Sequence, residues 1–128
     1  MEKEFHKNCF ACGEFSPKGL ELKFSLRNNV LTGKFKISDN YQGYDDIAHG
    51  GIIATVLDSS MVNLFYKRDG FKLKTAKLNI CFRKQIPINK RFIVTAVADD
   101  TAKHFYKAKS KIRIKDTVFA EAEGYFRK

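Results

Sequence analysis

The stretch from Ile52 to Tyr66 limits the possible folds of this chain more than any other. Its fifteen residues are almost all apolar or small, it contains no proline, and basic residues and a glycine follow at 67–70. This ending is typical of a helix C-terminus. A helix that is apolar on nearly every side must be covered by other elements, and this one is too short to span a bilayer. The stretch therefore predicts one buried central helix.

Two features of this helix indicate chemistry. Asp58 is a carboxylate among apolar residues, and burying it is costly unless it has hydrogen-bond partners or a task. Gly50 and Gly51 lie at the helix start, where backbone N–H groups are accessible and the helix dipole adds positive potential. Such N–H groups can polarise a carbonyl and stabilise an oxyanion. One helix would thus carry an electrophile-activating end and a general base or nucleophile.

The distance between these two features predicts a dimer. Asp58 lies about seven residues into the helix, hence roughly 10 Å from its N-terminus at ~1.5 Å per residue. Within one chain the two groups are too far apart to act on the same carbonyl. A second, antiparallel copy of the helix would bring its Asp58 beside the first copy's Gly50. We therefore expect a homodimer with shared active sites, and the sequence leaves open whether two dimers form a tetramer.

Length and composition predict a single domain over residues 1–128. Residues 1–18 are charged and lack an apolar segment, so neither a signal peptide nor a membrane span is expected. Three cysteines, an odd number, then favour a reducing, cytoplasmic setting. The net charge of +10 favours an anionic ligand, either a phosphate-bearing molecule or nucleic acid. Nucleic acid ranks last, because the aromatic residues alternate inward and form no stacking platform.

Residues 1–19 are expected to be irregular, because they are rich in turn-forming residues. His6, Cys9 and Cys12 are residue types that bind zinc. No second Cys or His pair follows at metal-ligand spacing, since Cys81 stands alone in a later strand, and a structural zinc site takes four ligands. We therefore expect small residues packed in a turn, with no metal and no other cofactor.

The remaining segments alternate apolar and polar residues with the period of strands. Residues 20–27 form the first such run, Asn28-Asn29 predicts a tight hairpin, and 30–37 forms the returning strand. Further strands are expected over 76–83, 92–98, 106–115 and 118–126. The run 92–98 is apolar on both faces and is expected to be central or at an interface. The fold class is therefore α+β: a curled antiparallel sheet of about five to six strands wrapped around one long central helix.

Over most of its length the chain resembles the hot-dog-fold acyl-CoA thioesterases, in particular the branch similar to the phenylacetate-pathway (PaaI-like) enzymes. The central motif carries most of the resemblance: Tyr41-Gln42-Gly43, then His49-Gly50-Gly51, then Leu57-Asp58. An N-terminal signature is matched by Cys9-Phe10-Ala11-Cys12-Gly13 with Pro17-Lys18-Gly19-Leu20. The strand after the helix is matched more weakly, by residues 75–80 and Pro87.

This resemblance implies a hot-dog fold and hydrolysis of a small-molecule acyl- or aryl-CoA thioester without a cofactor. It implies that the Gly50 N–H polarises the thioester carbonyl while His49 orients the loop. Asp58 of the partner subunit would act as nucleophile or as general base on a water, and Thr75 stands where relatives orient that water. Some relatives place an Asn at the position of Gly43, and here Gln42 is the neighbouring amide that could replace it.

Other residues are assigned to substrate binding. Gly43 and Gly51 are expected to line the substrate site. Four basic residues around one turn are expected to bind the phosphates of CoA through charge-assisted hydrogen bonds: Arg83, Lys84, Lys90 and Arg91. The other basic row, residues 107–115, is expected to be a solvated strand face opposite Glu121 and Glu123.

Other functions remain as alternatives to hydrolysis. A non-catalytic acyl-CoA binding or sensing module on the same fold would keep the pocket but would not need Asp58. A hydratase or dehydratase is disfavoured, because Asp45 and Asp46 do not lie at the hydratase spacing from His49. The sequence does not determine the acyl group.

Overall fold

One long helix and one six-stranded sheet make up the fold. The computed structural model describes residues 6–16 and 18–128. Its elements follow in the order β1 (Phe24–Arg27), β2 (Val30–Lys36), a 3-10 turn η2 (Asp39–Tyr41), α1 (Gly50–Asp69), β3 (Lys74–Phe82), β4 (Arg91–Asp99), β5 (Tyr106–Ile114) and β6 (Thr117–Arg127). All pairings are antiparallel, and the strand order is β1-β2-β4-β5-β6-β3.

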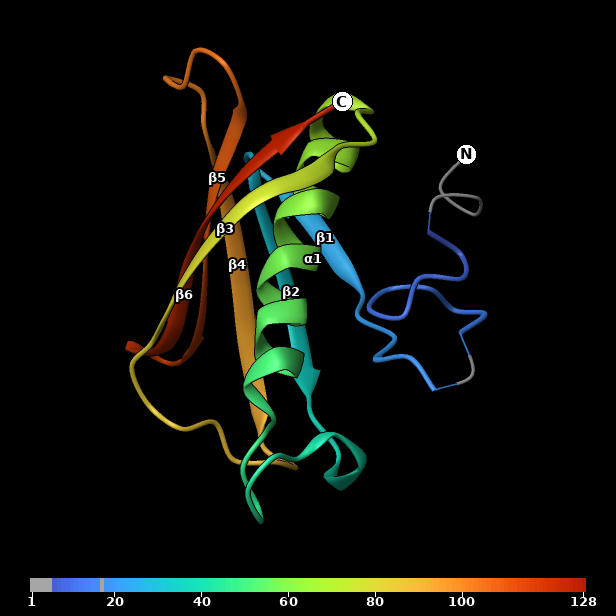
Figure 1. Ribbon diagram of the computed structural model, residues 1–128, viewed down its shortest axis with the longest axis vertical. Coiled ribbons are helices and arrows are strands. Elements are labelled where there is room, and N and C mark those ends of the chain that lie inside the picture. Colours follow the sequence, from blue (N-terminus) through green and yellow to red (C-terminus); the bar gives the residue numbers. More distant parts are fainter. Residues whose placement is uncertain (1–5, 17) are drawn as a thin grey trace.

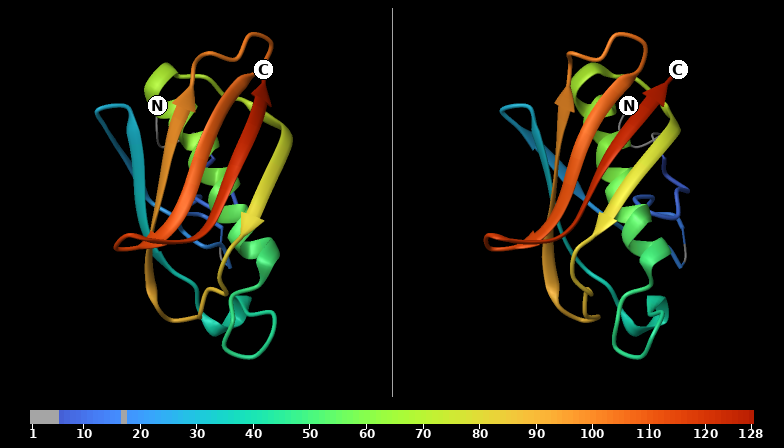
Figure 2. Two further views of the ribbon diagram at one scale, coloured as in Figure 1. Left: turned by 90° about the vertical axis from the view of Figure 1, so that its left-hand side faces the viewer. Right: turned by 60° about the vertical axis from the view of Figure 1, so that its left-hand side comes forward.

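The sheet curls around α1, as predicted (Figure 1). Figure 2 shows the outer face of the sheet with the helix behind it. β4 lies between β2 and β5, which confirms the central position expected from its two apolar faces. The inner face packs on α1 through buried side chains: Leu31, Phe35, Val94, Ala96, Ala108, Ile112, Ala120 and Phe126. The predicted α+β architecture is therefore confirmed.

The central helix is longer than the apolar run that predicted it. It begins at Gly50, with His49 as N-cap, and ends at Asp69. Gly70 then adopts φ 74, a left-handed conformation that glycine accepts without steric cost, and its N–H bonds to the Tyr66 carbonyl at 2.8 Å. Ten of the helix residues are buried, as a helix without a polar face requires. Within residues 6–16 and 18–128, no helix is long and apolar enough to cross a membrane.

The first predicted strand is shorter than expected. Residues 20–23 are not part of β1, although the apolar side of the run still turns inward at Leu22, which is buried. The extended backbone is interrupted at Glu21, which adopts φ 55. The Leu22 N–H bonds to the Ala11 carbonyl at 2.8 Å instead of pairing with β2. Contact with residues 6–16, here called the N-terminal segment, thus overrides the alternating pattern.

The hairpin after β1 is confirmed. Asn28 and Asn29 both have positive φ values, 52 and 62, as a two-residue type I′ turn requires. Asn tolerates this left-handed conformation better than most other residues do. The turn sets the register between β1 and β2, in which Arg27 lies opposite Val30.

Strand β3 departs from the predicted alternation. It is an edge strand that pairs with β6, and only Leu78 and Ile80 of its residues are partly covered. Ala76, expected to face inward, is exposed, because the register shifts between Thr75 and Lys77. Such a bulge adds one residue to the strand and reverses the facing of the residues before it. Thr75 is thereby turned onto the helix side of the sheet.

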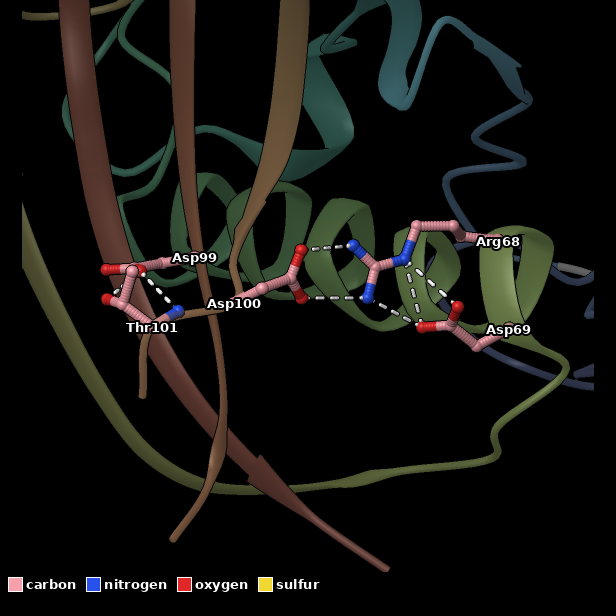
Figure 3. Close-up of polar contacts among 5 residues, drawn as sticks. All are labelled: Arg68, Asp69, Asp99, Asp100 and Thr101. Carbon is pink, nitrogen blue, oxygen red and sulfur yellow. Dashed lines mark hydrogen bonds and ion pairs between the residues drawn. The ribbon is translucent and has the colours of Figure 1, made fainter. Parts of the chain in front are cut away.

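An ion-pair network fixes the C-terminal end of α1 to the turn after β4. The Arg68 guanidinium donates to both carboxylate oxygens of Asp100 at 3.0 Å and to Asp69 at 2.8 Å (Figure 3). These hydrogen bonds raise the pKa of Arg68 further above its already high value. Asp99 holds the same turn by accepting the Thr101 N–H at 3.1 Å. The planar guanidinium of Arg68 therefore donates hydrogen bonds to two carboxylates at once, those of Asp69 and Asp100.

We expect Arg68→Met to lower the free energy of unfolding by about 0.5–1 kcal/mol, because it keeps an apolar stem but loses both pairs. Arg68→Lys should recover only part of this, since an ammonium cannot bridge two carboxylates bidentately. Urea denaturation at low and high salt measures both effects. Equal stability of the lysine variant and the wild type would contradict the bidentate role.

Candidate active site

The N-terminus of α1 leaves one backbone donor open. A helix start has four N–H groups without partners in the helix itself. The His49 N–H bonds to the Tyr41 carbonyl at 2.9 Å, the Ile52 N–H bonds to the His49 carbonyl at 2.9 Å, and the Gly51 N–H bonds to His49 Nδ1 at 2.9 Å. Within the described parts of the chain, the Gly50 N–H has no acceptor. This exposed group, at the positive end of the helix, is therefore free to bind a carbonyl oxygen.

His49 shapes this end of the helix. Because Nδ1 accepts the Gly51 N–H, the proton of the neutral ring lies on Nε2. A Cβ on Gly51 would lie 3.1 Å from Nδ1, and one on Gly43 would lie 3.3 Å from the His49 Cα. Both glycines thus allow the ring and the preceding loop to pack closely. Their contact with substrate stays a prediction.

Asp58 is half-buried in the middle of α1 and is held by β3. Thr75 Oγ1 donates a hydrogen bond to Asp58 Oδ1 at 2.6 Å, which the bulge in β3 makes possible. Burial raises the pKa of the Asp58 carboxyl, while the hydrogen bond from Thr75 and the nearby charge of His6 lower it in part. A carboxylate whose pKa is raised by burial is a stronger base, as a proton acceptor in a reaction requires. Thr75 therefore orients the carboxylate directly.

The predicted residues form two separate groups within one chain. Asp58 and Thr75 meet in the middle of α1, whereas His49 and Gly50 lie at its N-terminus. Asp58 follows Gly50 by eight residues, hence by roughly 12 Å along the helix axis at ~1.5 Å per residue. Both groups therefore cannot act on one carbonyl carbon unless a second chain supplies one of them.

Gln42 belongs to the loop that leads into the helix. Its Oε1 accepts the Asp46 N–H at 2.9 Å, and its backbone forms a bridge with Ala48. The side-chain oxygen therefore stabilises its own loop, where Asp46 adopts a positive φ of 66. Only the amide Nε2 of Gln42 remains as a donor toward a ligand, and this role stays a prediction.

The four basic residues assigned to CoA lie around the loop between β3 and β4. This loop packs against the segment before α1, because the Ala48 N–H bonds to the Ile86 carbonyl at 2.7 Å. The Arg83 guanidinium forms an ion pair at 2.9 Å with Glu121 on β6, the neighbouring strand in the sheet. The other three side chains are exposed: Lys84, Lys90 and Arg91. Arg83 is thus the least suited of the four to bind a phosphate.

Two neighbours of the site were not found from the sequence. His6 lies within electrostatic range of Asp58, because the N-terminal segment passes along α1. Phe82, at the end of β3, is 54% exposed, and its ring would lie 3.9 Å from a Cβ on Gly50. Neither contact has a signal in sequence spacing, since each joins segments that only the fold brings together.

A groove of about 610 Å³ lies on the outer face of the sheet, away from Asp58. Its lining includes Lys109, Lys111, Glu121 and Glu123, whose cross-strand pairing confirms the basic row opposite two glutamates. Asp58 and Thr75 lie on the other side of the sheet. The groove is therefore not the candidate active site.

Several solved structures superpose on this chain, and some of them are thioesterase superfamily proteins. One thioesterase superfamily protein superposes with a TM-score of 0.83 at 20% identity, over 92% of this chain and 62% of that protein. This chain thus spans less than two thirds of that relative. The phenylacetic acid degradation protein PaaI from Thermus thermophilus, as a single-residue variant, gives 0.73 at 16% identity over 85% and 95%. A Bacillus halodurans protein solved with CoA gives 0.72 at 21% identity over 85% and 74%.

These likenesses establish the fold. The sequence matches no protein-family model and no curated protein. The chain has the hot-dog fold of the thioesterase superfamily, as its resemblance implied, and PaaI proteins are among its structural neighbours. Its activity has to be argued from the site.

The raised pKa of Asp58 predicts a stability change. A carboxyl with a folded-state pKa above its unfolded value stabilises the fold below about pH 4, and this contribution is lost as the pH rises through the folded-state pKa. We therefore expect Asp58→Asn to raise Tm by a few degrees at pH 7.5, since Asn still accepts the Thr75 hydroxyl. Calorimetry should show this gain shrinking toward pH 4.

The exposed turn residue Asp116 is the matched control. Asp116→Asn should change Tm little at either pH. A lower Tm for Asp58→Asn at pH 7.5, or a gain that does not depend on pH, would contradict the desolvation of Asp58.

Proposed function

We propose that the protein hydrolyses the thioester of a small-molecule acyl- or aryl-CoA. The observation that carries this proposal is that one helix presents both an open N–H, that of Gly50, and a carboxylate whose pKa burial raises, that of Asp58. Thioester hydrolysis needs a polarised carbonyl and a base or nucleophile, and nothing more. The superfamily of its structural neighbours and the CoA bound to one of them support this assignment.

In the proposed reaction the thioester oxygen accepts the Gly50 N–H. Asp58 of the partner subunit either takes a proton from a water that attacks the carbonyl carbon or attacks that carbon itself. When the C–S bond breaks, the sulfur of CoA takes a proton, either the one that Asp58 removed from the attacking water or, if Asp58 attacked, one from solvent. In the second case water then hydrolyses the anhydride between Asp58 and the acyl group, and the free acid is released. Thr75 holds the carboxylate in one orientation, and the negative charge on the carbonyl oxygen is stabilised by the helix N-terminus.

The shared site requires a homodimer, which the open edge of the sheet supports. β3 pairs with β6 on one side, and no described strand pairs with its other side. An exposed edge with unpaired backbone groups is a template for pairing with another chain. Antiparallel pairing of two β3 strands would also place the two α1 helices antiparallel, and it would cover Phe82. We therefore assign the interface to β3 and the adjacent face of α1.

The phosphates of CoA are assigned to the basic loop between β3 and β4. Its exposed side chains, Lys84, Lys90 and Arg91, lie in a segment bonded to the loop before α1, the end where the thioester would bind. The net charge of +10 attracts an anionic substrate to the protein as a whole.

The first test of this function is thiol release from CoA esters of short, medium, long and aryl acids. We expect turnover of at least one ester and a loss of about a hundredfold or more in Asp58→Asn, the usual scale for removing a central catalytic group. Asp116→Asn should retain wild-type activity. Binding of CoA esters without turnover would indicate a non-catalytic binding module, and neither binding nor turnover would reject an acyl-CoA function.

A second test removes only the Gly50 N–H. Proline is favoured at the first position of a helix and lacks this N–H, and His49 already has φ −62 and ψ 134, which suit the residue before a proline. We expect Gly50→Pro to fold but to lose roughly 10²–10³-fold in kcat. Gly50→Ala keeps the N–H, and its Cβ meets nothing closer than Phe82 at 3.9 Å, so it should remain active.

Mixing the two inactive variants tests the shared site. A mixed dimer of Gly50→Pro and Asp58→Asn chains has one site with both groups intact. Co-refolding equal amounts should therefore restore about a quarter of wild-type activity, because half of the dimers are mixed and each has one working site. No recovery, with mixed dimers verified by separate affinity tags, would show that the two groups do not act across an interface.

A further inference from the structure

The N-terminal segment brings three metal-binding side chains together. The ligand atoms of His6, Cys9 and Cys12 all lie within 4.8 Å of one another. The distance from Cys12 Sγ to His6 Nδ1 is 3.6 Å. In a tetrahedral zinc site, with bonds of about 2.3 Å to sulfur and about 2.0–2.1 Å to nitrogen, a sulfur and a nitrogen ligand lie roughly 3.5–3.6 Å apart. The observed spacing is therefore that of two ligands on one zinc ion.

The backbone of this segment is wound to hold the three side chains in place. The Cys9 N–H bonds to the His6 carbonyl at 2.8 Å, and the Gly13 N–H bonds to the Cys9 carbonyl at 2.8 Å. A Cβ on Gly13 would lie 2.4 Å from the Cys9 nitrogen and 2.5 Å from the His6 carbonyl oxygen, so only glycine fits. The turn thus holds the backbone of His6 and Cys9 at a fixed spacing, with Gly13 packed against both.

Both sulfur atoms already receive an N–H donor. The Ala11 N–H points at Cys9 Sγ at 3.4 Å, and Asn63 Nδ2 points at Cys12 Sγ at 3.7 Å. Such donors stabilise the thiolate form that a metal binds. Asn63 is buried in α1, and its amide is fixed by a further bond to the Ser59 carbonyl at 2.8 Å. The central helix therefore supplies an outer hydrogen bond to the cluster.

The segment is attached to the fold at several points. Ala11 is buried, and its carbonyl accepts the Leu22 N–H at 2.8 Å. The Phe10 ring packs edge-on against Tyr41, whose hydroxyl donates to the Lys18 carbonyl. In Figure 1 the segment, drawn in blue, lies next to β1, and its contact with α1 runs through Asn63 and Cys12. The cluster therefore lies against α1, the helix that carries the candidate catalytic carboxylate.

We propose that His6, Cys9 and Cys12 bind one zinc ion, which fixes the N-terminal segment against α1 beside Asp58. Two thiolates and a neutral imidazole balance the charge of Zn²⁺, so the half-buried site would carry no net charge. The thiol protons are released on binding. The described residues supply three ligands, and the fourth tetrahedral position falls to a water or another exchangeable group. This site differs from the four-ligand arrangement that the cysteine spacing argued against, and it does not depend on the proposed hydrolysis.

The third cysteine provides a matched control, because Cys81 is exposed on β3 and outside the cluster. The full chain is purified under reducing conditions, loaded with Zn²⁺ and dialysed, and its metal content is measured by mass spectrometry. We expect about one zinc per chain for the wild type and for Cys81→Ser, and less than about a tenth of that for Cys9→Ser and Cys12→Ser. Calorimetry verifies that each variant is folded.

Replacement by Co²⁺ tests the ligand set directly. The wild type and Cys81→Ser should show the thiolate-to-cobalt charge-transfer absorption and intense visible bands of a tetrahedral site, and the Cys9→Ser and Cys12→Ser variants should lose them. Metal removal should also lower Tm, and zinc should restore it. Equal metal content in all four proteins, or a wild type that retains no metal under reducing conditions, would overturn the proposal.

Discussion

The packing of α1 against the inner face of the curled sheet is the constraint on which the rest of the molecule depends. The helix has no polar face, so it is stable only where the sheet and the N-terminal segment cover it. Its placement also fixes the chemistry. His49 accepts the N–H groups of Gly51 and Ile52, the Tyr41 carbonyl accepts that of His49, and the Gly50 N–H is left open. The same rigid element carries Asp58 roughly 12 Å away, so the distance between the two groups cannot adjust to bring both onto one substrate.

The role proposed for Asp58 is opposed to stability. Burial disfavours the charged form of Asp58, and the hydrogen bond from Thr75 offsets that effect only in part. A carboxylate kept in this state is a stronger base than an exposed one. The bulge in β3 belongs to the same arrangement, because without it Thr75 would face away from the helix. Burial of Asp58 lowers stability, and the bulge interrupts the regular pairing of β3. Both costs fall at the residues proposed to carry the reaction.

Much of the architecture could be predicted from local patterns. The apolar run identified α1, the paired asparagines identified the first hairpin, and the doubly apolar run identified β4 as central. Predictions failed where a distant segment competed for the same backbone groups. Residues 20–23 alternate like a strand, yet the Leu22 N–H bonds to Ala11. Likewise, Ala76 fits the period of β3, but the bulge moves it outward. Periodicity describes one segment at a time. It therefore cannot show that a distant segment will bond to the same backbone groups.

The sequence by itself determined which residue types stand at each position along the helix: an accessible glycine at its start and one carboxylate among apolar residues. It also determined the fold class, because helix and strand periods are local properties of a chain. Only the tertiary structure decided which donors stay open, which side chain orients Asp58 and what surrounds Cys12. His6, Cys9 and Cys12 looked insufficient for a metal when judged by spacing along the chain. They form a cluster because a tight turn and a buried asparagine from α1 converge on them. Hydrogen bonds and ligand geometry depend on distances in space, and these are fixed only when the elements pack together.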